Sequence, residues 1–490
     1  MNFLRRPRFA LTWIMLQGKE SSTPKPAAAI VLALVAIALT LARSASPSGA
    51  DESQRDSIPN LQAFHDPSGT FATFNTAGDI DTGGPFFQDL GTNGRRCVTC
   101  HQPNDSWTVS PPHIQARFEA TEGRDPIFRT NDGSTCPTAD VSTEDARRQA
   151  YSLLLNKGLI RIELAVPTSA EYTVLDSDNP YGCTSTSAIS VYRRPLPSTN
   201  LPDLSTVMWD GRETFKDVSG KLQPVPFDLA HQAVDATLGH AQAAHPPTPE
   251  QVQQIVDFET KLFTAQVRDH DAGDLDEAGA KGGPVHLNNQ EFFIGINDPL
   301  GGNPTGAPFT PNIFSLYQKW ANINDRDYDE RTEARRAVAR GEHLFNTLHI
   351  PITGVAGLND ALNQPVINGF CGTCHDSPNV GDHSVPAPLN IGLTDASRRT
   401  LDLPLITLRN NKTGEIVQVS DPGRALITGK WADIGKFKGP ILRSLAARAP
   451  YFHNGSAATL LDAVNFYDTR FNLHLSQNQK DDLVAFLKTL

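Results

Sequence analysis

The sequence contains little methionine. Only Met1, Met15 and Met208 occur among its 490 residues, and the first two lie in the N-terminal segment. No residue after Met208 can therefore supply a thioether as a ligand. Any site in the second half of the chain that needs a metal-binding side chain must use another residue type or reach back to Met208.

Basic charge is also scarce. The chain has 43 lysines and arginines against 54 aspartates and glutamates, which gives a net charge of −11 at pH 7. It shows no basic stripe of the kind that displaces counterions from phosphates, so the composition excludes nucleic acid as the partner. With 39% hydrophobic and 20% charged residues, the chain has the composition of a soluble globular protein of several domains.

Long apolar runs are missing except near the N-terminus. Arg5, Arg6 and Arg8 precede an apolar run of about 16 residues at 27–42, and small residues follow at 48–50. This order matches the charged, apolar and cleavage regions of a secretory signal. The run is shorter than the roughly 20 residues of a membrane-spanning helix. We expect residues 1–50 to be a signal peptide, and an uncleaved anchor that associates with the membrane is the alternative; both place the folded chain outside the cytoplasm.

The chain has only six cysteines, and four of them occur in two copies of Cys-x-x-Cys-His. These copies consist of Cys97, Cys100 and His101, and of Cys371, Cys374 and His375. In c-type attachment the two thiols add to the haem vinyl groups and the adjacent histidine binds the iron. A zinc site needs a closed set of four ligands, and neither zinc nor a thioredoxin-like motif explains the repeated histidine. The motifs predict two covalently bound haem c groups, haem 1 and haem 2.

The remaining cysteines, Cys136 and Cys183, are expected to pair with each other. Disulfides form in exported proteins, and this one would close a loop of about 48 residues and stabilise the fold. Two unpaired, buried thiols are the alternative.

Helix signals flank both motifs. Residues 332–345 have the spacing of an amphipathic helix. Thr248 followed by Pro249 begins another, with an apolar stripe that runs to Leu262. Ser476 and Gln479 form a capping box for a closing helix.

These signals predict a mainly α fold with two cytochrome c-like haem domains, at residues 51–328 and 329–490. A segment rich in proline, serine, threonine and glycine separates the first motif from the rest of its domain. We expect this segment, at about 105–200, to be an insertion of loops and short strands over haem 1.

Three pieces of the sequence resemble a known family. They are the paired haem motifs, the segment VMWDGRE at 207–213, and the segment FKGPILRSLAARAPYFHNGSAATLLDAVNFYD at 437–468. Together they are similar to the bacterial dihaem cytochrome c peroxidases and their MauG-type relatives, most clearly in the second domain. Residues 105–200 have no counterpart in the shorter peroxidases. The resemblance implies a periplasmic location.

The resemblance also implies roles for two aromatic residues. Tyr467 stands where the peroxidases carry a methionine ligand of haem 2 and the MauG-type enzymes carry a tyrosine, so it is the candidate sixth ligand. The alternative is that Tyr467 packs within a helix, with His383 as the ligand or with that position open. Trp209 corresponds to a tryptophan between the two haems and is the candidate electron relay, or else an aromatic side chain that fills the domain interface.

At haem 1 the resemblance implies an open iron position with a glutamine above it, which corresponds to Gln232. The family's proline and glutamate that follow are absent, and His231 and His240 are the nearby groups able to move a proton. For both histidines an exposed or structural role is the alternative, and we take His240 as the candidate. The family also holds a calcium ion between its domains, but Arg448 stands where a threonine contributes to that site.

The expected function is that of an exported dihaem peroxidase. Hydrogen peroxide would be reduced at haem 1, with electrons that come from a small redox protein or another donor and pass through haem 2. The alternative is a MauG-like oxidase whose haem 2, with histidine and tyrosine ligands, serves the oxidation of a protein or organic substrate. A third reading is a pure electron-transfer cytochrome with both irons six-coordinate.

Overall fold

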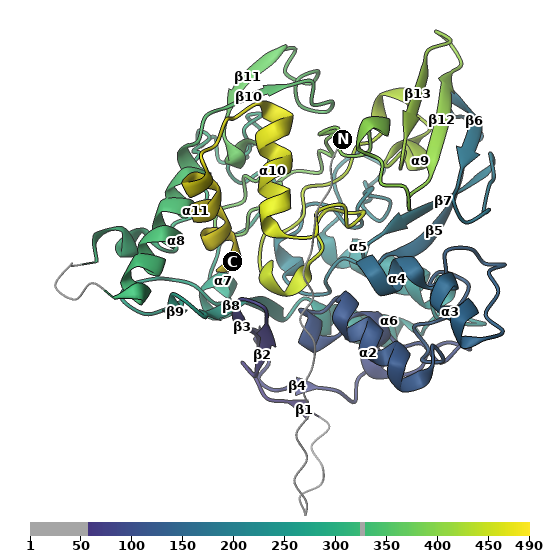
Figure 1. Cartoon of the computed structure of the whole chain (residues 1–490), viewed down its shortest axis with the longest axis horizontal. Coiled ribbons are helices and arrows are strands. Elements are labelled where there is room, and N and C mark those ends of the chain that lie inside the picture. Colours follow the sequence, from purple (N-terminus) through teal and green to yellow (C-terminus); the bar gives the residue numbers. More distant parts are fainter. Residues whose placement is uncertain (1–56, 324–328) are drawn as a thin grey trace, which may run out of the picture. The chain divides into compact units, whose positions relative to one another are not determined.

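The computed structural model describes residues 57–323 and 329–490 (Figure 1). The predicted signal segment at 1–50 lies outside the described residues. Within those residues, no helix has the length and hydropathy needed to cross a membrane. Contacts group residues 56–490 into one unit, and the domain boundary at 328/329 stays a prediction.

The described chain mixes helices with strands. It is 31% helical and 17% strand, so the expectation of a mainly α fold is not confirmed. The helices are α1 (Cys97–Cys100), α2 (Pro111–Thr121), α3 (Glu144–Ala150), α4 (Ser152–Lys157), α5 (Val225–Gly239), α6 (Pro249–Glu259), α7 (Pro284–Asn288), α8 (Glu330–Thr347), α9 (Ala425–Thr428), α10 (Leu460–Phe471) and α11 (Gln477–Lys488). The strands are β1 (Ser57–Ile58), β2 (Ala63–Asp66), β3 (Gly69–Asn75), β4 (Ile80–Asp81), β5 (Ile160–Ala165), β6 (Tyr172–Asp178), β7 (Ala188–Arg193), β8 (Leu262–Asp269), β9 (Gly273–Asp274), β10 (Ile350–Thr353), β11 (Val366–Gly369), β12 (Leu405–Asn410) and β13 (Ile416–Val419).

Three helices begin where the sequence predicts them. Thr248 caps α6 and Ser476 caps α11, each in a reciprocal capping box with the glutamine three residues later. Helix α8 covers the predicted amphipathic segment and packs against α11 (Figure 1). The apolar stripe of α6 was predicted to reach Leu262, which is wrong. The helix ends at Glu259, and Leu262 begins β8, where it pairs with Asn75 of β3.

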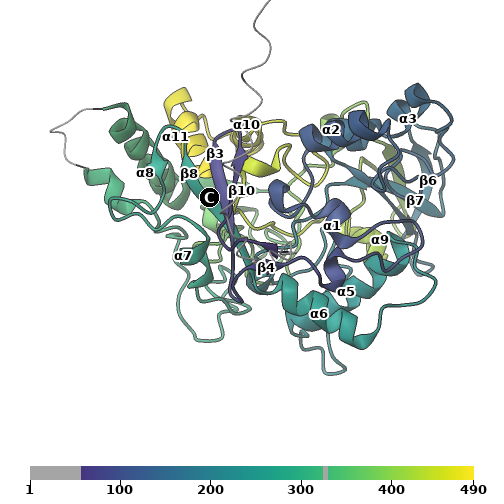
Figure 2. The same ribbon diagram turned by 90° about the horizontal axis from the view of Figure 1, so that it is seen from below.

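A four-stranded sheet in the order β2-β3-β8-β9 supports the first motif. A buried hydroxyl, that of Thr264 on β8, lies 2.9 Å from the hydroxyl of Thr73 on β3 and 2.8 Å from that of Thr199. Thr73 also accepts a 2.8 Å hydrogen bond from the indole of Trp107. The sheet therefore holds both ends of the predicted insertion. Beside the first motif, α5 and α6 pack against each other (Figure 2).

The predicted insertion contains helices as well as loops and strands. Helices α2, α3 and α4 lie within it, and α3 begins at Thr143, whose hydroxyl accepts from the Ala146 amide. The prediction missed them because these helices are short and lie among turn-forming residues. Cys136 and Cys183 form the predicted disulfide, with Cα atoms 5.6 Å apart across 47 residues of sequence.

The insertion is tied to the second half of the chain by a three-stranded sheet in the order β13-β12-β6. Strand β6 pairs antiparallel with β12, and the ladder extends from Asp178 opposite Leu405 to Tyr172 opposite Asn410. Tyr172, Ile189, Ile406 and Leu408 are buried together beside it. This packing makes the insertion part of the core.

Candidate functional site

The first motif forms a single turn that fixes its histidine. Helix α1 covers Cys97–Cys100, and the His101 amide donates to the Cys97 carbonyl at 3.0 Å. His101 Nδ1 lies 3.0 Å from the carbonyl oxygen of Trp107. That contact places the ring proton on Nδ1 and leaves Nε2 free to bind a metal. Burial lowers the pKa of His101 to about 4, so the ring is neutral at pH 7.

The second motif repeats this arrangement. The His375 amide donates to the Cys371 carbonyl at 3.1 Å, and His375 Nδ1 lies 2.7 Å from the carbonyl oxygen of Gly381. As in the first motif, that carbonyl comes six residues after the histidine. Burial also lowers the pKa of His375 to about 4. Both histidines are therefore neutral, and in each the same nitrogen is available to bind a metal.

The four motif cysteines are free, whereas Cys136 and Cys183 are joined. Burial raises the pKa of Cys97, Cys371 and Cys374 to about 12 and also raises that of Cys100. In each motif two unpaired thiols thus lie beside a neutral histidine. This donor set fits covalent haem attachment, with the thiols as attachment points and the histidine as the axial ligand.

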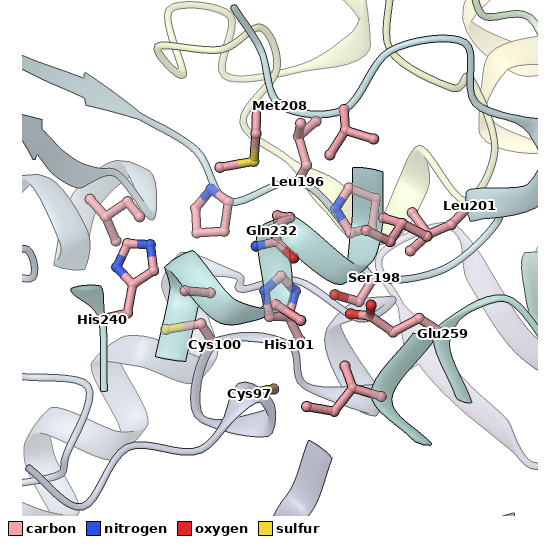
Figure 3. A pocket seen from close by; sticks show the side chains of 18 of the residues that line it. Cys97, Cys100, His101, Leu196, Ser198, Leu201, Met208, Gln232, His240 and Glu259 are labelled. Atoms are coloured by element: carbon pink, nitrogen blue, oxygen red, sulfur yellow. The ribbon is translucent and has the colours of Figure 1, made fainter. Parts of the chain in front are cut away.

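A cavity of about 180 Å³ lies beside the first motif, and its walls are mainly apolar. Mostly apolar walls with a few polar groups are typical of ligand and cofactor sites. Figure 3 shows Cys97, Cys100 and His101 in the lower part of the view, with Gln232 near His101 and Met208 towards the top. Apolar side chains such as Leu196 and Leu201 supply much of the remaining wall.

Helix α5 places both predicted polar residues of the first site in this cavity. Its lining residues are Leu229, Gln232, Ala233, Ala236 and Thr237, followed by His240 and Ala241, a spacing that corresponds to one helix face. His231 is outside the lining, and its Nδ1 lies 2.6 Å from Glu213 Oε2. The structure thus brings Gln232 and His240 together with His101 and separates His231 from them.

Trp209 lines the same cavity and also contacts the second half of the chain. Its indole N–H donates to the Arg194 carbonyl at 2.8 Å, and its own carbonyl accepts from the Lys438 amide at 2.9 Å. Its ring centroid lies 6.1 Å from that of His453. Gly439 follows Lys438 and lies close to the second motif. A Cβ on Gly439 would lie 3.3 Å from the Cys374 carbonyl oxygen.

A buried ion cluster lies directly beside Trp209. Arg193 contacts Asp210 at 2.5 Å and binds both oxygens of Asp421 at 2.8 and 3.0 Å. Burial alone would raise the pKa of Asp210, but the nearby Arg193 and Arg212 guanidinium groups bring it below its ordinary 3.8. The cluster joins β7, the turn that contains Trp209 and Asp210, and the segment before α9. It therefore fixes the position of Trp209.

Both candidate sixth ligands of the second site lie near its motif, His383 buried and Tyr467 partly buried. Tyr467 on α10 packs in one apolar cluster with Cys371 and Cys374, and burial together with these thiols raises the pKa of its phenol. A bound metal cation would reverse this effect. His383 Nδ1 lies 2.9 Å from Asp376 Oδ2, and its buried Nε2 has no hydrogen-bond partner among the described residues.

Several other polar atoms around the second motif are buried without a hydrogen-bond partner in the described chain. They belong to Ser377, Asp382, Ser384, Arg443 and Ser444. Because buried polar groups are normally paired, such a group of atoms indicates a polar partner that the chain itself does not supply. A haem carboxylate could accept hydrogen bonds from the three hydroxyls and the Arg443 guanidinium of this group.

The residues at the predicted calcium position do not fit a calcium ion. The buried Arg448 guanidinium donates to the carbonyl oxygens of Ile441, Arg443 and Ser444, with the Ile441 contact at 2.9 Å. Calcium needs six to eight oxygen ligands, and here these oxygens already face an internal cation. Arg448 thus supplies the positive charge at this place.

We expect removal of calcium to leave the wild-type protein unchanged. Because the Arg448 guanidinium already pairs the carbonyls, EDTA should shift the melting temperature by less than the error of a thermal melt. Arg448→Thr should be destabilised by about 1–3 kcal/mol through the unpaired buried carbonyls. A fall in the melting temperature of the wild type on chelation, reversed by added calcium, would contradict this.

Sequence reasoning missed several polar residues of the first cavity. Arg95, Asp132 and Glu259 are among those that line it. Burial raises the pKa of Glu259 to about 7. Arg95 lies two residues before Cys97, which was an available signal. Asp132 belongs to an Asn-Asp-Gly turn, and nothing in that pattern indicates a site.

Comparisons with known proteins identify relatives of this chain. No protein-family model matches it. Cytochrome-c peroxidase IdrP2 of Pseudomonas sp. (strain SCT) is 29% identical over 201 residues, which cover 37% of this chain and 53% of that protein. Cytochrome c peroxidase Ccp of Escherichia coli is 34% identical over 309 residues, which cover 55% of this chain and 60% of that protein.

A solved MauG-like protein associated with microbial copper homeostasis aligns over 83% of this chain and 85% of its own, with a TM-score of 0.36 and 15% identity. The matches span little more than half the length of these curated relatives. The chain is thus similar to the bacterial cytochrome c peroxidases.

Proposed function

We propose that the protein is an exported, periplasmic dihaem peroxidase that reduces hydrogen peroxide in the cavity beside His101. One observation carries this proposal: His101, Gln232 and His240 line a single cavity. A metal-binding histidine and two groups able to bind and protonate peroxide thus share one space. We further propose that the chain forms two cytochrome c-like domains, at 51–328 and 329–490, and that each holds one haem.

The two motifs would hold the cofactors. Cys97, Cys100 and His101 would hold haem 1. Cys371, Cys374 and His375 would hold haem 2. When bound, the haems supply iron for peroxide cleavage and for the storage and transfer of electrons. The polar groups of the chain then bind peroxide and move its protons, and a small redox protein or another donor supplies two electrons.

His240 and Gln232 handle the peroxide. Gln232 orients it through hydrogen bonds from its side-chain amide. His240 accepts a proton from one peroxide oxygen and donates it to the other as the O–O bond breaks, so that the leaving oxygen departs as water. With two electrons and two further protons, one peroxide yields two waters. The apolar walls exclude bulk water and strengthen these polar contacts.

Trp209 connects the two sites. It lines the first cavity, and its carbonyl accepts from the amide of Lys438, the residue before Gly439. A Cβ on Gly439 would lie 3.3 Å from the Cys374 carbonyl oxygen. An indole can be oxidised transiently, so this ring is an aromatic link between the two sites. We propose that it relays electrons from haem 2 to the first cavity.

Tyr467 favours a second candidate function. Its position beside Cys371 and Cys374 supports a phenolate ligand at haem 2, and an anionic oxygen ligand stabilises oxidised iron. Such a site suits a MauG-like oxidase that acts on a protein or organic substrate, whereas a donor-fed peroxidase benefits from a higher potential.

Spectroscopy and turnover of the holoprotein distinguish a peroxidase from the other candidate functions. We expect a high-spin ferric signal that cyanide removes and stoichiometric peroxide consumes, together with turnover by reduced cytochrome c. His240→Ala should lower the rate of peroxide consumption by roughly 10²–10⁴-fold, while His231→Ala, on the same helix but outside the cavity, should not.

Two other outcomes would decide against a peroxidase. Low-spin signals at both sites, with no reaction with peroxide, would indicate an electron-transfer cytochrome. A long-lived oxidised state after peroxide, without turnover by cytochrome c, would favour the oxidase.

A further inference from the structure

We propose that Asp132, held in place by Arg95, positions His240 for proton transfer, so that the insertion at 105–200 completes the peroxide site. This inference rests on the proposed function, because it assigns a partner to the residue that moves the proton. Asp132 is a positioning residue, since it acts through His240. It adds to the site a carboxylate from the segment that separates this chain from the shorter peroxidases.

The backbone of His240 is held by three side chains. His240 follows the last residue of α5, where a carbonyl has no partner within the helix. Its carbonyl oxygen accepts from Asn93 at 2.8 Å, from Arg95 at 3.3 Å and from Asn131 at 3.4 Å. Asn93 and Arg95 belong to the loop before the first motif, and Asn131 belongs to the insertion. The helix end is thus fixed relative to both.

The His240 ring is oriented by the insertion. Its Nδ1 lies 2.5 Å from Asp132 Oδ2, and the other carboxylate oxygen, Oδ1, forms an ion pair with Arg95. Burial raises the pKa of Asp132, but His240 and Arg95 outweigh it and keep the pKa below 3.8. The carboxylate therefore accepts a hydrogen bond from Nδ1–H. Nε2 is then the ring nitrogen that can exchange a proton with peroxide.

Asp132 and Arg95 are themselves held in place by hydrogen bonds to the backbone. The Asp132 carbonyl accepts from the Arg161 amide on β5 at 2.7 Å, and the Arg161 guanidinium donates to the Asn131 carbonyl at 2.5 Å. Arg95 also donates to the carbonyls of residues 126 and 127 at 2.8 and 2.7 Å. Both partners of His240 are nearly inaccessible to solvent, with Asp132 8% and Arg95 4% exposed.

The same helix carries a pair that serves as an internal control. His231 Nδ1 lies 2.6 Å from Glu213 Oε2, the carboxylate is 6% exposed and the histidine 48%. In the His240–Asp132 pair the corresponding exposures are 8% and 41%. The two pairs match in geometry and burial, but only His240 and Asp132 line the cavity. Any effect specific to the cavity should therefore appear in one pair and not in the other.

The experiment compares Asp132→Asn with Glu213→Gln in the holoprotein. One readout is the association rate of hydrogen cyanide with the ferric protein, because this ligand must lose a proton as it binds. The second is the association rate of carbon monoxide with the ferrous protein, because this ligand brings no proton. Both are read from haem absorbance and need no peroxidase turnover.

We expect Asp132→Asn to slow cyanide association by about ten- to a hundredfold, within the range of a lost general base, and to leave carbon monoxide association within about twofold. Glu213→Gln should change neither rate. In a His240→Ala background Asp132→Asn should cause no further loss, since the carboxylate acts through the ring. If Asp132→Asn gives no holoprotein, Asp132→Ser replaces it with the same expectations.

Each other outcome has a distinct meaning. An unchanged cyanide rate in Asp132→Asn, or equal slowing of cyanide and carbon monoxide, would overturn the positioning role while the wild type still binds both ligands. If the wild type binds neither ligand, the proposed function itself fails.

Discussion

Replacing Arg193 with leucine is expected to lower the free energy of unfolding by about 3–5 kcal/mol, because it leaves buried carboxylates without their partner. Arg193 and Asp210 are fully buried, and Asp421 is nearly so. Arg148→Leu is the control, since that arginine pairs with Glu119 and Glu144 at the surface and is 44% exposed. It should change the free energy of unfolding far less, because exposed ion pairs contribute little to stability. Urea denaturation of the holoproteins measures both.

The loss of unfolding free energy caused by Arg193→Leu should depend on pH. In the wild type the pKa of Asp210 is lowered, so its contribution is present above the unfolded pKa of about 3.9 and is lost as the pH falls through the folded pKa. Without Arg193, burial raises the pKa of Asp210, and acid then removes the buried charge. The difference from wild type should be largest near pH 7 and smaller near pH 4. A deficit that is constant or grows on acidification would show that the ion cluster is not its cause.

Replacing Tyr467 with methionine is expected to raise the midpoint potential of the second haem by hundreds of millivolts. Axial ligands set haem potentials over a range of about 0.8 V, and a thioether favours reduced iron whereas a phenolate favours oxidised iron. Tyr467→Phe should remove the phenolate charge-transfer absorption without adding a ligand. Spectroelectrochemical titration of the holoprotein measures both effects.

Tyr317→Phe is the matched control. Tyr317 is more fully buried than Tyr467, and the Tyr317 hydroxyl donates to the Thr489 carbonyl at 2.8 Å. Its loss should cost about 1 kcal/mol of stability and leave the potential unchanged. If both Tyr467 variants kept the wild-type spectrum and potential, His383, whose Nε2 has no partner, would become the ligand to test.

What the sequence predicts well is local or covalent in origin. The Cys-x-x-Cys-His motifs identify the histidines that the structure holds by carbonyls six residues later. Capping boxes place the starts of α6 and α11, because a cap involves only residues three apart. The placement of Gln232 and His240 in one cavity follows from their spacing on α5, which is also a local property.

What the sequence does not predict depends on contacts between distant residues. Asp132 reaches His240 across 108 positions, and no local pattern marks it. Leu262, the first residue of β8, was assigned to the apolar stripe of α6 because an apolar residue fits either a helix or a strand. Its pairing with Asn75 of β3 decides for the strand. The helical content of the insertion was missed because turn-forming residues dominate its composition.

The β6–β12 ladder has a consequence for the order in which the chain can fold. Thr407 pairs with Asp176, so the insertion cannot complete its sheet until most of the polypeptide has been made. Until then β6 has an unpaired edge that can capture other chains. Contacts between residues so far apart also slow folding. Chains truncated before β12 should therefore aggregate through this edge.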